Sequence, residues 1–202
     1  GEILRGRPEV PIVATAAVRR AIERDDAAKN AIVGPMMGDE WPTQRQFPNR
    51  TVVDSVELGG LSFSVRDLGA AESPADSLWF LDERSIFVGD LVYNGLHAYL
   101  ADGHYEGWLA CLDQMQSSLA RGAILYVGHG QPGGLELLAA QKRYVEAFVA
   151  SVQANLAMDP DARRAAVVGD MKRLLPTEGL SFLMELSVDP VAASLEGGTH
   201  AP

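Results

Sequence analysis

The sequence has only one cysteine, Cys111, among its 202 residues. An intrachain disulfide is therefore excluded, which favours a reducing compartment, although many exported proteins also lack disulfides. Long apolar runs are missing as well, since none approaches the ~20 residues that a membrane-spanning helix needs. We expect a cytoplasmic protein with no membrane partner, and an exported form stays open.

Basic residues are also scarce. Lysine and arginine total 17 against 27 aspartates and glutamates, the formal net charge is −10, and basic residues cluster only in isolated pairs such as Arg19-Arg20. Proteins that bind nucleic acid need a basic patch, so no nucleic-acid partner is expected. A hydrophobic content of 47% and a mean hydropathy of zero are typical of a globular chain with one substantial core.

Two strand patterns end in residues that can bind metal. In SLWFLDERSIFVGD, residues 77–90, two apolar runs flank a polar turn, which predicts a hairpin whose second strand ends at Asp90. YVGHG, residues 126–130, repeats the pattern with His129. A glycine precedes each polar residue and allows a sharp turn at a strand end, where sites of open sheets form. We expect Asp90 and His129 to lie within ~6 Å of each other, the span of ligands to adjacent metals.

The remaining patterns predict a mixture of strands and helices. Gly59-Gly60 is a hairpin signal, Thr15 is a candidate helix N-cap, and the segment from Gly34 to Asn49, with three prolines, predicts an ordered loop. Within that loop, Trp41 and Phe47 either wall a pocket or pin the loop to the core. The expected strands are residues 10–14, 51–58, 61–68, 78–81, 86–88 and 123–127. The expected helices follow Thr15, cover residues 105–120 and 135–157, and begin near Pro160 and Pro176.

Further polar side chains cluster downstream of Asp90. His97, Asp102 and His104 lie within eight residues on a loop before a helix, and each type can bind metal or transfer a proton. Taken singly, each also has a structural explanation; Asp102, for example, can cap the helix. Glu72 lies in the loop GAAESPAD ahead of the hairpin, where a glutamate is usually just solvated.

With FVGD at Asp90 and YVGHG at His129, the segment from Ser77 to Gly130 resembles the C-terminal half of the metallo-β-lactamase-fold superfamily of metallo-hydrolases. The resemblance covers roughly residues 1–150. It implies an α/β (α+β) fold, part of an αββα sandwich with a mixed β-sheet and outer helices. Residues 151–202 are expected to form a helical C-terminal extension packed on the same domain.

The resemblance also implies a site. Asp90 would bridge two metal ions and His129 would bind the second; Glu72 stands at or near the position of a histidine common in the family, which makes it a further candidate ligand. The implied cofactor is a divalent metal, zinc in the first place with two ions in the complete site, and iron or manganese as alternatives. Tyr93, His97, Asp102 and His104 are the implied substrate-binding residues.

One part of the family's pattern is absent. Its His-x-His-x-Asp-His motif precedes the first strand-helix step, whereas nothing precedes Gly1 here, and GEILR at residues 1–5 has the pattern of the last turn of a helix. We therefore expect a domain that lacks its N-terminal portion and that by itself binds metal weakly or not at all. Its apolar sheet face would be covered by a further segment or by a second copy in a homodimer.

The activity implied by the resemblance is hydrolysis by a metal-activated water. The substrate would be a small molecule with an ester, lactone, amide, thioester or phosphoester bond. Two alternatives stay open: a non-catalytic or truncated fragment with the same fold, and an iron-dependent redox enzyme on this fold. Metal analysis separates hydrolysis on zinc from redox chemistry on iron.

Overall fold

A computed structural model describes residues 7, 9–42 and 44–198. The helical turn expected at residues 1–5 lies outside the described residues. The strands are β1 (Val13–Thr15), β2 (Arg50–Val52), β3 (Ser55–Leu58), β4 (Leu61–Gly69), β5 (Asp76–Phe80), β6 (Ser85–Tyr93) and β7 (Ile124–His129). The helices are α1 (Ala16–Met37), the short 3-10 helix η2 (Gly38–Glu40), α2 (Tyr105–Ser118), α3 (Glu136–Ala154), α4 (Pro160–Leu174) and α5 (Ser181–Gly198).

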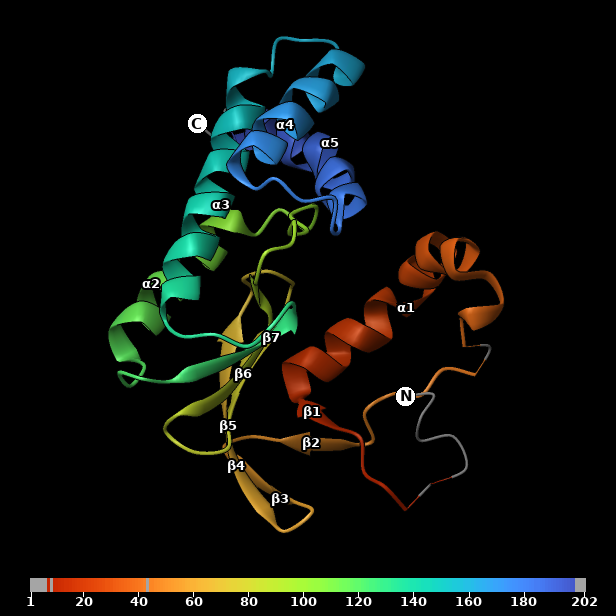
Figure 1. The fold of residues 1–202 in the computed structure, drawn as a ribbon. Helices are drawn as coiled ribbons and strands as arrows, with labels where there is room; N and C mark the ends of the chain where they lie inside the picture. Colours follow the sequence, from red (N-terminus) through yellow and green to blue (C-terminus); the bar gives the residue numbers. More distant parts are fainter. Residues whose placement is uncertain (1–6, 8, 43, 199–202) are drawn as a thin grey trace.

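The central element is a five-stranded mixed sheet in the order β3-β4-β5-β6-β7. Neighbouring strands are antiparallel except β6 and β7, which are parallel. A parallel pair needs a crossover connection, and α2 supplies it. Helices α2 and α3 cover one face of the sheet (Figure 1), where Ile86, Leu125 and Phe148 are completely buried. This arrangement agrees with the α/β class expected from the sequence.

The C-terminal helices extend the same core. Val167 of α4 and Val188 of α5 belong to the buried cluster that contains Ile86 of the sheet, and α3 runs across the expected boundary at residue 150. Helix α4 begins as its sequence predicts, because the Asp159 carboxylate accepts from two backbone N–H groups and Pro160 needs no such partner. Within the described residues, no helix is both long and apolar enough to cross a membrane.

The strand expected at residues 51–58 is in fact two strands in different sheets. Arg50–Val52 pairs in parallel with β1, whereas Ser55–Leu58 pairs with β4 through the Gly59-Gly60 turn. The chain leaves one sheet and enters the other at Val53, which is 81% exposed. A continuous β-type pattern cannot reveal this change of partner, because both segments satisfy the same periodicity.

The expected loop at residues 34–49 begins later than predicted. Helix α1 follows the predicted cap at Thr15 but continues through Pro35 to Met37, and it ends where Gly38 adopts a φ of +54°. The Trp41 indole N–H donates to Asn30 Oδ1 at 2.6 Å, so Trp41 pins the loop to α1. Trp41 also lines a hollow between this loop and the helix.

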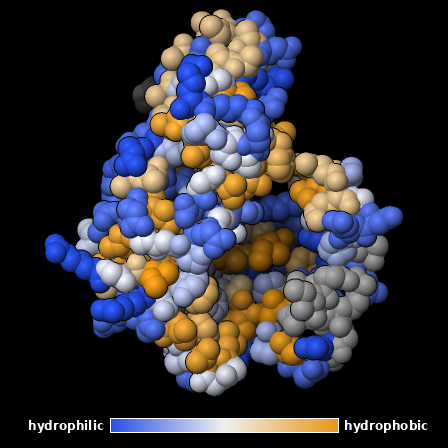
Figure 2. All heavy atoms as spheres, in the orientation of Figure 1, coloured by the Kyte–Doolittle hydropathy of each residue, from blue (hydrophilic) through white to orange (hydrophobic). Residues whose placement is uncertain are grey.

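The other face of the sheet carries a row of aromatic rings. The rings of Phe87 and Tyr126 stack at 4.8 Å, and Phe63 lies 6.1 Å from Phe87 and 6.4 Å from Trp79. Phe87 is 39% exposed. Helix α1 stands on this side of the molecule (Figure 1), yet none of its residues is buried. Figure 2 shows apolar side chains gathered over the end of the molecule that carries β2, β3 and β4.

Candidate functional site

Asp90 lies inside β6, not at its end as the sequence predicted. Gly89 has a φ of +55°, and the pairing register between β6 and β7 shifts on both sides of it. This irregularity is a bulge, a feature that redirects side chains and is frequent beside functional sites. The strand then continues to Tyr93, and the Asp90 side chain remains 45% exposed.

His129 ends β7 beside Asp90. Its Nε2 lies 3.7 Å from Asp90 Oδ1, which confirms the predicted proximity of the two residues. Gly128 makes this approach possible, because a Cβ at that position would lie 1.8 Å from Asp90 Oδ1. The Asp90 carboxylate therefore lies directly against the backbone of β7.

Tyr93 connects His129 with Glu72. Its ring stacks on the His129 imidazole, with centroids 5.2 Å apart and planes inclined by 17°, and its hydroxyl donates to Glu72 Oε1 at 3.4 Å. Burial, together with the negative charges of Glu72 and Asp90, raises the pKa of Tyr93 above its usual value, so the phenol stays protonated. Of the expected substrate-binding residues, Tyr93 is in direct contact with His129.

Glu72 is positioned by a tightly bonded loop. The Asp76 carboxylate accepts from the backbone N–H groups of Ala71 and Ser73, which fixes the turn on both sides of Glu72. Burial raises the pKa of Glu72 to about 8, and the negative charges of Asp90 and Asp76 act in the same direction. Without a bound cation, Glu72 is therefore mainly a neutral carboxylic acid at pH 7.

Asp102 and His104 lie in the loop between β6 and α2. The charge of Asp102 contributes to the raised pKa values of Glu72 and Tyr99, so it acts on the same region as Asp90. His104 occupies the N-cap position of α2, and its side chain makes no capping bond. The helix cap considered for Asp102 is therefore not observed, and both side chains are half-buried.

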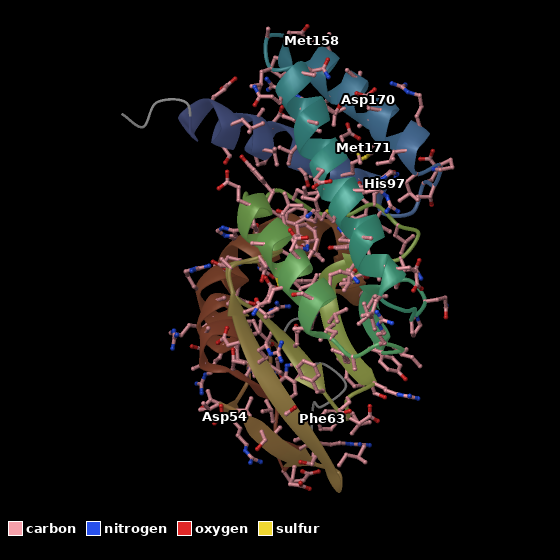
Figure 3. All side chains as sticks on the ribbon, turned by 90° about the vertical axis from the view of Figure 1, so that its left-hand side faces the viewer. Asp54, Phe63, His97, Met158, Asp170 and Met171 are labelled. Carbon is pink, nitrogen blue, oxygen red and sulfur yellow. The ribbon has the colours of Figure 1, made fainter. Side chains whose placement is uncertain are left out.

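His97 is not part of this cluster. Its side chain is completely buried, with Nδ1 2.9 Å from the Tyr144 hydroxyl and Nε2 3.1 Å from the carbonyl oxygen of Thr177. In Figure 3, His97 lies beside α3, close to the C-terminal helices. Since both ring nitrogens are bonded in the interior, His97 joins core elements, and its expected contact with a substrate is not possible in this arrangement.

The donors at this site fit part of a zinc centre. Imidazole nitrogen and carboxylate oxygen are ordinary zinc ligands, and Asp90 and His129 present one of each. In the part of the chain that the structure describes, however, no three His, Cys, Asp or Glu side chains group closely enough to hold a metal ion. Zinc sites need at least three protein ligands, so these residues alone do not complete a metal centre.

Two residues of the site escaped sequence reasoning. Gln141 of α3 is buried and accepts the Tyr93 backbone N–H at 3.0 Å, and no spacing marks it among other helical residues. Gly128 stands in the YVGHG segment, but its close approach to Asp90 depends on the register of β6 against β7, which the sequence does not encode locally.

Comparison with known proteins gives structural matches only. No protein-family model and no curated protein sequence matches the chain. Among solved structures, a beta-lactamase domain protein from Burkholderia ambifaria aligns with a TM-score of 0.62 over 97% of this chain and 61% of its own, at 16% identity. A metallo-beta-lactamase family protein from Thermus thermophilus aligns with a TM-score of 0.59 over 93% and 67%, at 15% identity.

A metallo-beta-lactamase from Pontibacter korlensis is similar over a smaller region. It aligns with a TM-score of 0.53 over 72% of this chain and 61% of its own, at 20% identity. The chain thus spans about three fifths to two thirds of the length of these three structures. At such low identity the matches establish the fold and nothing finer.

Proposed function

We propose that this chain, which has the metallo-β-lactamase fold, works as part of a metal-dependent hydrolase that acts on an ester, lactone, amide, thioester or phosphoester of a small molecule. The observation that carries the proposal is the pair Asp90 and His129 on adjacent parallel strands, 3.7 Å apart and half exposed. The bulge at Gly89 and the bare backbone at Gly128 both serve this pairing. Bulges are over-represented beside active sites, which supports the proposal.

In this proposal Asp90 and His129 are ligands, and Glu72 is the third candidate. A divalent cation, zinc in the first place, would supply a water acidic enough to lose its proton near neutral pH. Tyr93 would hold the His129 ring in place through stacking, and its protonated hydroxyl keeps Glu72 beside the pair. Asp102 and His104, on the loop beyond β6, would contact the substrate. Further ligands beyond these residues are required for a complete centre.

The first test is metal affinity. We expect the 202-residue chain to bind zinc weakly in equilibrium dialysis, and the Asp90→Asn variant to bind at least about tenfold more weakly still, because a charged ligand becomes neutral. Asp113→Asn is the matched control, since Asp113 lies on α2 and pairs with Lys142. Stoichiometric binding of two zinc ions by the chain would show that residues outside the proposed set are ligands.

The second test is activity. The polypeptide encoded by the intact gene is assayed with an ester, a lactone, a thioester and a phosphodiester, and hydrolysis should depend on added zinc and disappear in Asp90→Asn. A visible absorption band from bound iron, without hydrolysis, would instead favour redox chemistry.

A non-catalytic role is the second candidate. The observation that favours it is that no three potential ligands group together in the described residues. In that case Asp90→Asn and His129→Gln should alter neither metal affinity nor any hydrolytic rate, and the pair would matter only for the stability of the sheet.

A further inference from the structure

The turn that carries His129 is exposed and rich in glycine. Glycines stand directly before and after His129, at positions 128 and 130, and residues 130–132 are exposed. Glycine has more backbone freedom to lose than any other residue, so this turn needs bonds from other segments to stay in one conformation. The place of His129 beside Asp90 therefore depends on such bonds.

Asn94, which follows the last residue of β6, supplies two bonds to this turn. Its backbone N–H donates to the carbonyl oxygen of His129 at 3.0 Å, and its side-chain Nδ2 donates to the carbonyl oxygen of Gln131 at 2.8 Å. A carbonyl oxygen only accepts, so the Asn94 atom that faces Gln131 must be the amide nitrogen. The two bonds hold the turn on both sides of Gly130.

The turn also lies directly against the backbone of Asn94. Gly130 has a φ of +102°, and a Cβ there would lie 2.3 Å from the Asn94 carbonyl oxygen and 3.0 Å from the Asn94 Cβ. Only glycine allows the two segments to approach so closely. This close approach brings the carbonyl groups of His129 and Gln131 within reach of the two Asn94 donors.

Asn94 itself is attached to a fixed part of the molecule. Tyr93, the residue before it, is only 6% exposed, and the Tyr93 backbone N–H donates to Oε1 of the buried Gln141 on α3 at 3.0 Å. Asp90 lies on the same strand, β6. Because β6 carries Asp90 and is bonded to α3, the bonds of Asn94 fix the turn with His129 relative to Asp90.

We propose that Asn94 is a positioning residue for His129, which keeps the imidazole beside Asp90. The order of the turn depends on Asn94 whether or not a metal binds. The effect of Asn94 on metal affinity rests on the proposed function, in which His129 is a ligand. Changing a residue that orients a metal ligand commonly weakens metal binding about 10- to 100-fold.

Asn94→Leu tests this role, because it removes the side-chain donor and keeps a side chain of similar size. In the chain without metal, the ¹⁵N order parameters of the Gly130 and Gln131 amides should fall from about 0.85, typical of rigid backbone, to below about 0.6. Zinc affinity in equilibrium dialysis should weaken about tenfold. Asn94→Gln keeps an amide donor on a half-buried side chain and should recover most of both losses.

Asn155→Leu is the matched control. The Asn155 side chain donates to the carbonyl oxygen of Ser151 at 2.8 Å, a bond of the same kind and length, at the end of α3 farthest from the sheet (Figure 1). This substitution should lower stability as Asn94→Leu does, yet change neither the order parameters at residues 130 and 131 nor the zinc affinity. General destabilisation therefore does not imitate the expected result.

Two results would overturn the role of Asn94. The Gly130 and Gln131 amides could stay as rigid in Asn94→Leu as in the unaltered chain. Alternatively, His129→Gln could weaken zinc binding while Asn94→Leu leaves it unchanged, and the proposed function would then stand without Asn94. If Asn94→Leu loosens the turn but His129→Gln binds zinc as the unaltered chain does, the proposed function fails and Asn94 still positions His129.

Discussion

At the residue scale, Gly128 is a position where adding a side chain should disturb the pairing of Asp90 with His129. A Cβ there would meet Asp90 Oδ1 at 1.8 Å and the backbone of Gly89 at 3.0 Å. We expect Gly128→Ala to move the Asp90 carboxylate and to lower the free energy of unfolding by about 1–3 kcal/mol, as other overpacking substitutions do. Urea denaturation measures the loss.

Gly169→Ala is the matched control. Gly169 lies within α4, where an added Cβ meets only the flexible end of Arg173 at 3.4 Å. There alanine should stabilise the chain by about 0.5–1 kcal/mol, because it loses less backbone entropy than glycine on forming a helix. If both substitutions change the free energy of unfolding equally, the close approach of Asp90 does not restrict the residue at position 128.

His97 should make stability depend on pH. Burial lowers the pKa of His97 below its usual value of about 6.5, because the interior disfavours the charged ring. Between the folded and the unfolded pKa, the unfolded chain binds more protons, so the free energy of unfolding falls as the pH drops below about 6.5. Above that pH the contribution of His97 is fully present.

Urea denaturation between pH 7.5 and 5, at roughly half-unit steps, tests this dependence. His97→Gln should lower the free energy of unfolding at pH 7.5. It should also remove the part of the pH dependence of this free energy that His97 causes. The other histidines remain in both proteins, so the difference between the two curves isolates His97. If the free energy of unfolding falls with pH equally in both proteins, groups other than His97 cause the pH dependence.

At the element scale, the start of α4 depends on one carboxylate. Asp159 Oδ1 accepts from the backbone N–H groups of Asp161 and Ala162 at 3.1 and 3.0 Å. Asp159→Ala should reduce the free energy of unfolding by about 0.5–2 kcal/mol, measured by thermal or urea denaturation. Asp159→Asn retains the acceptor and should change it little; a similar loss in both variants would point to the charge instead of the cap.

The sequence predicted well those elements whose start or turn is determined by a few adjacent residues. The cap at Thr15, the Asp159-Pro160 start of α4 and the Gly59-Gly60 turn all lie where the pattern places them, because each depends on a few adjacent residues. The division of residues 51–58 between two sheets depends on pairing with distant strands, which no local pattern encodes.

The site likewise has residues that local sequence placed correctly and a residue that only distant packing places. The closeness of Asp90 and His129 was predictable because each follows a glycine after an apolar run, and the parallel crossover places β7 beside β6. The burial of His97 was not predictable, because its partners, Tyr144 and Thr177, lie 47 and 80 residues further along the chain. Local spacing placed His97 near Asp90, whereas packing against α3 placed it in the core.

At the scale of the whole molecule, the aromatic face of the sheet should promote self-association. Phe87 and Tyr126 stack, and Phe87 is 39% exposed, whereas its neighbours in β6, Ile86 and Val88, are buried in the core. We expect the chain to form dimers or larger species as its concentration rises, and Phe87→Ser to weaken this by at least about tenfold. Light scattering or sedimentation over a concentration series measures it.

Phe182→Ser is the control for that experiment. Phe182 is similarly exposed, at 44%, but it lies on α5, away from the sheet. If association depends on the sheet face, this substitution leaves it unchanged. A chain that stays monomeric at all concentrations would show that the exposed rings do not bind a second copy.

The lack of buried side chains in helix α1 determines how fast its backbone amides exchange with solvent deuterium. The helix spans 22 residues, Pro35 among them has no backbone N–H to donate, and none of its side chains is buried. Protection of backbone amides against deuterium depends on the free energy of local opening, and a helix with no buried side chain gains little such free energy from packing. Amides of α1 should therefore exchange within the first minutes of a deuterium pulse, long before those of α3, and a protease should cut the chain in α1 while the sheet and the C-terminal helices remain intact.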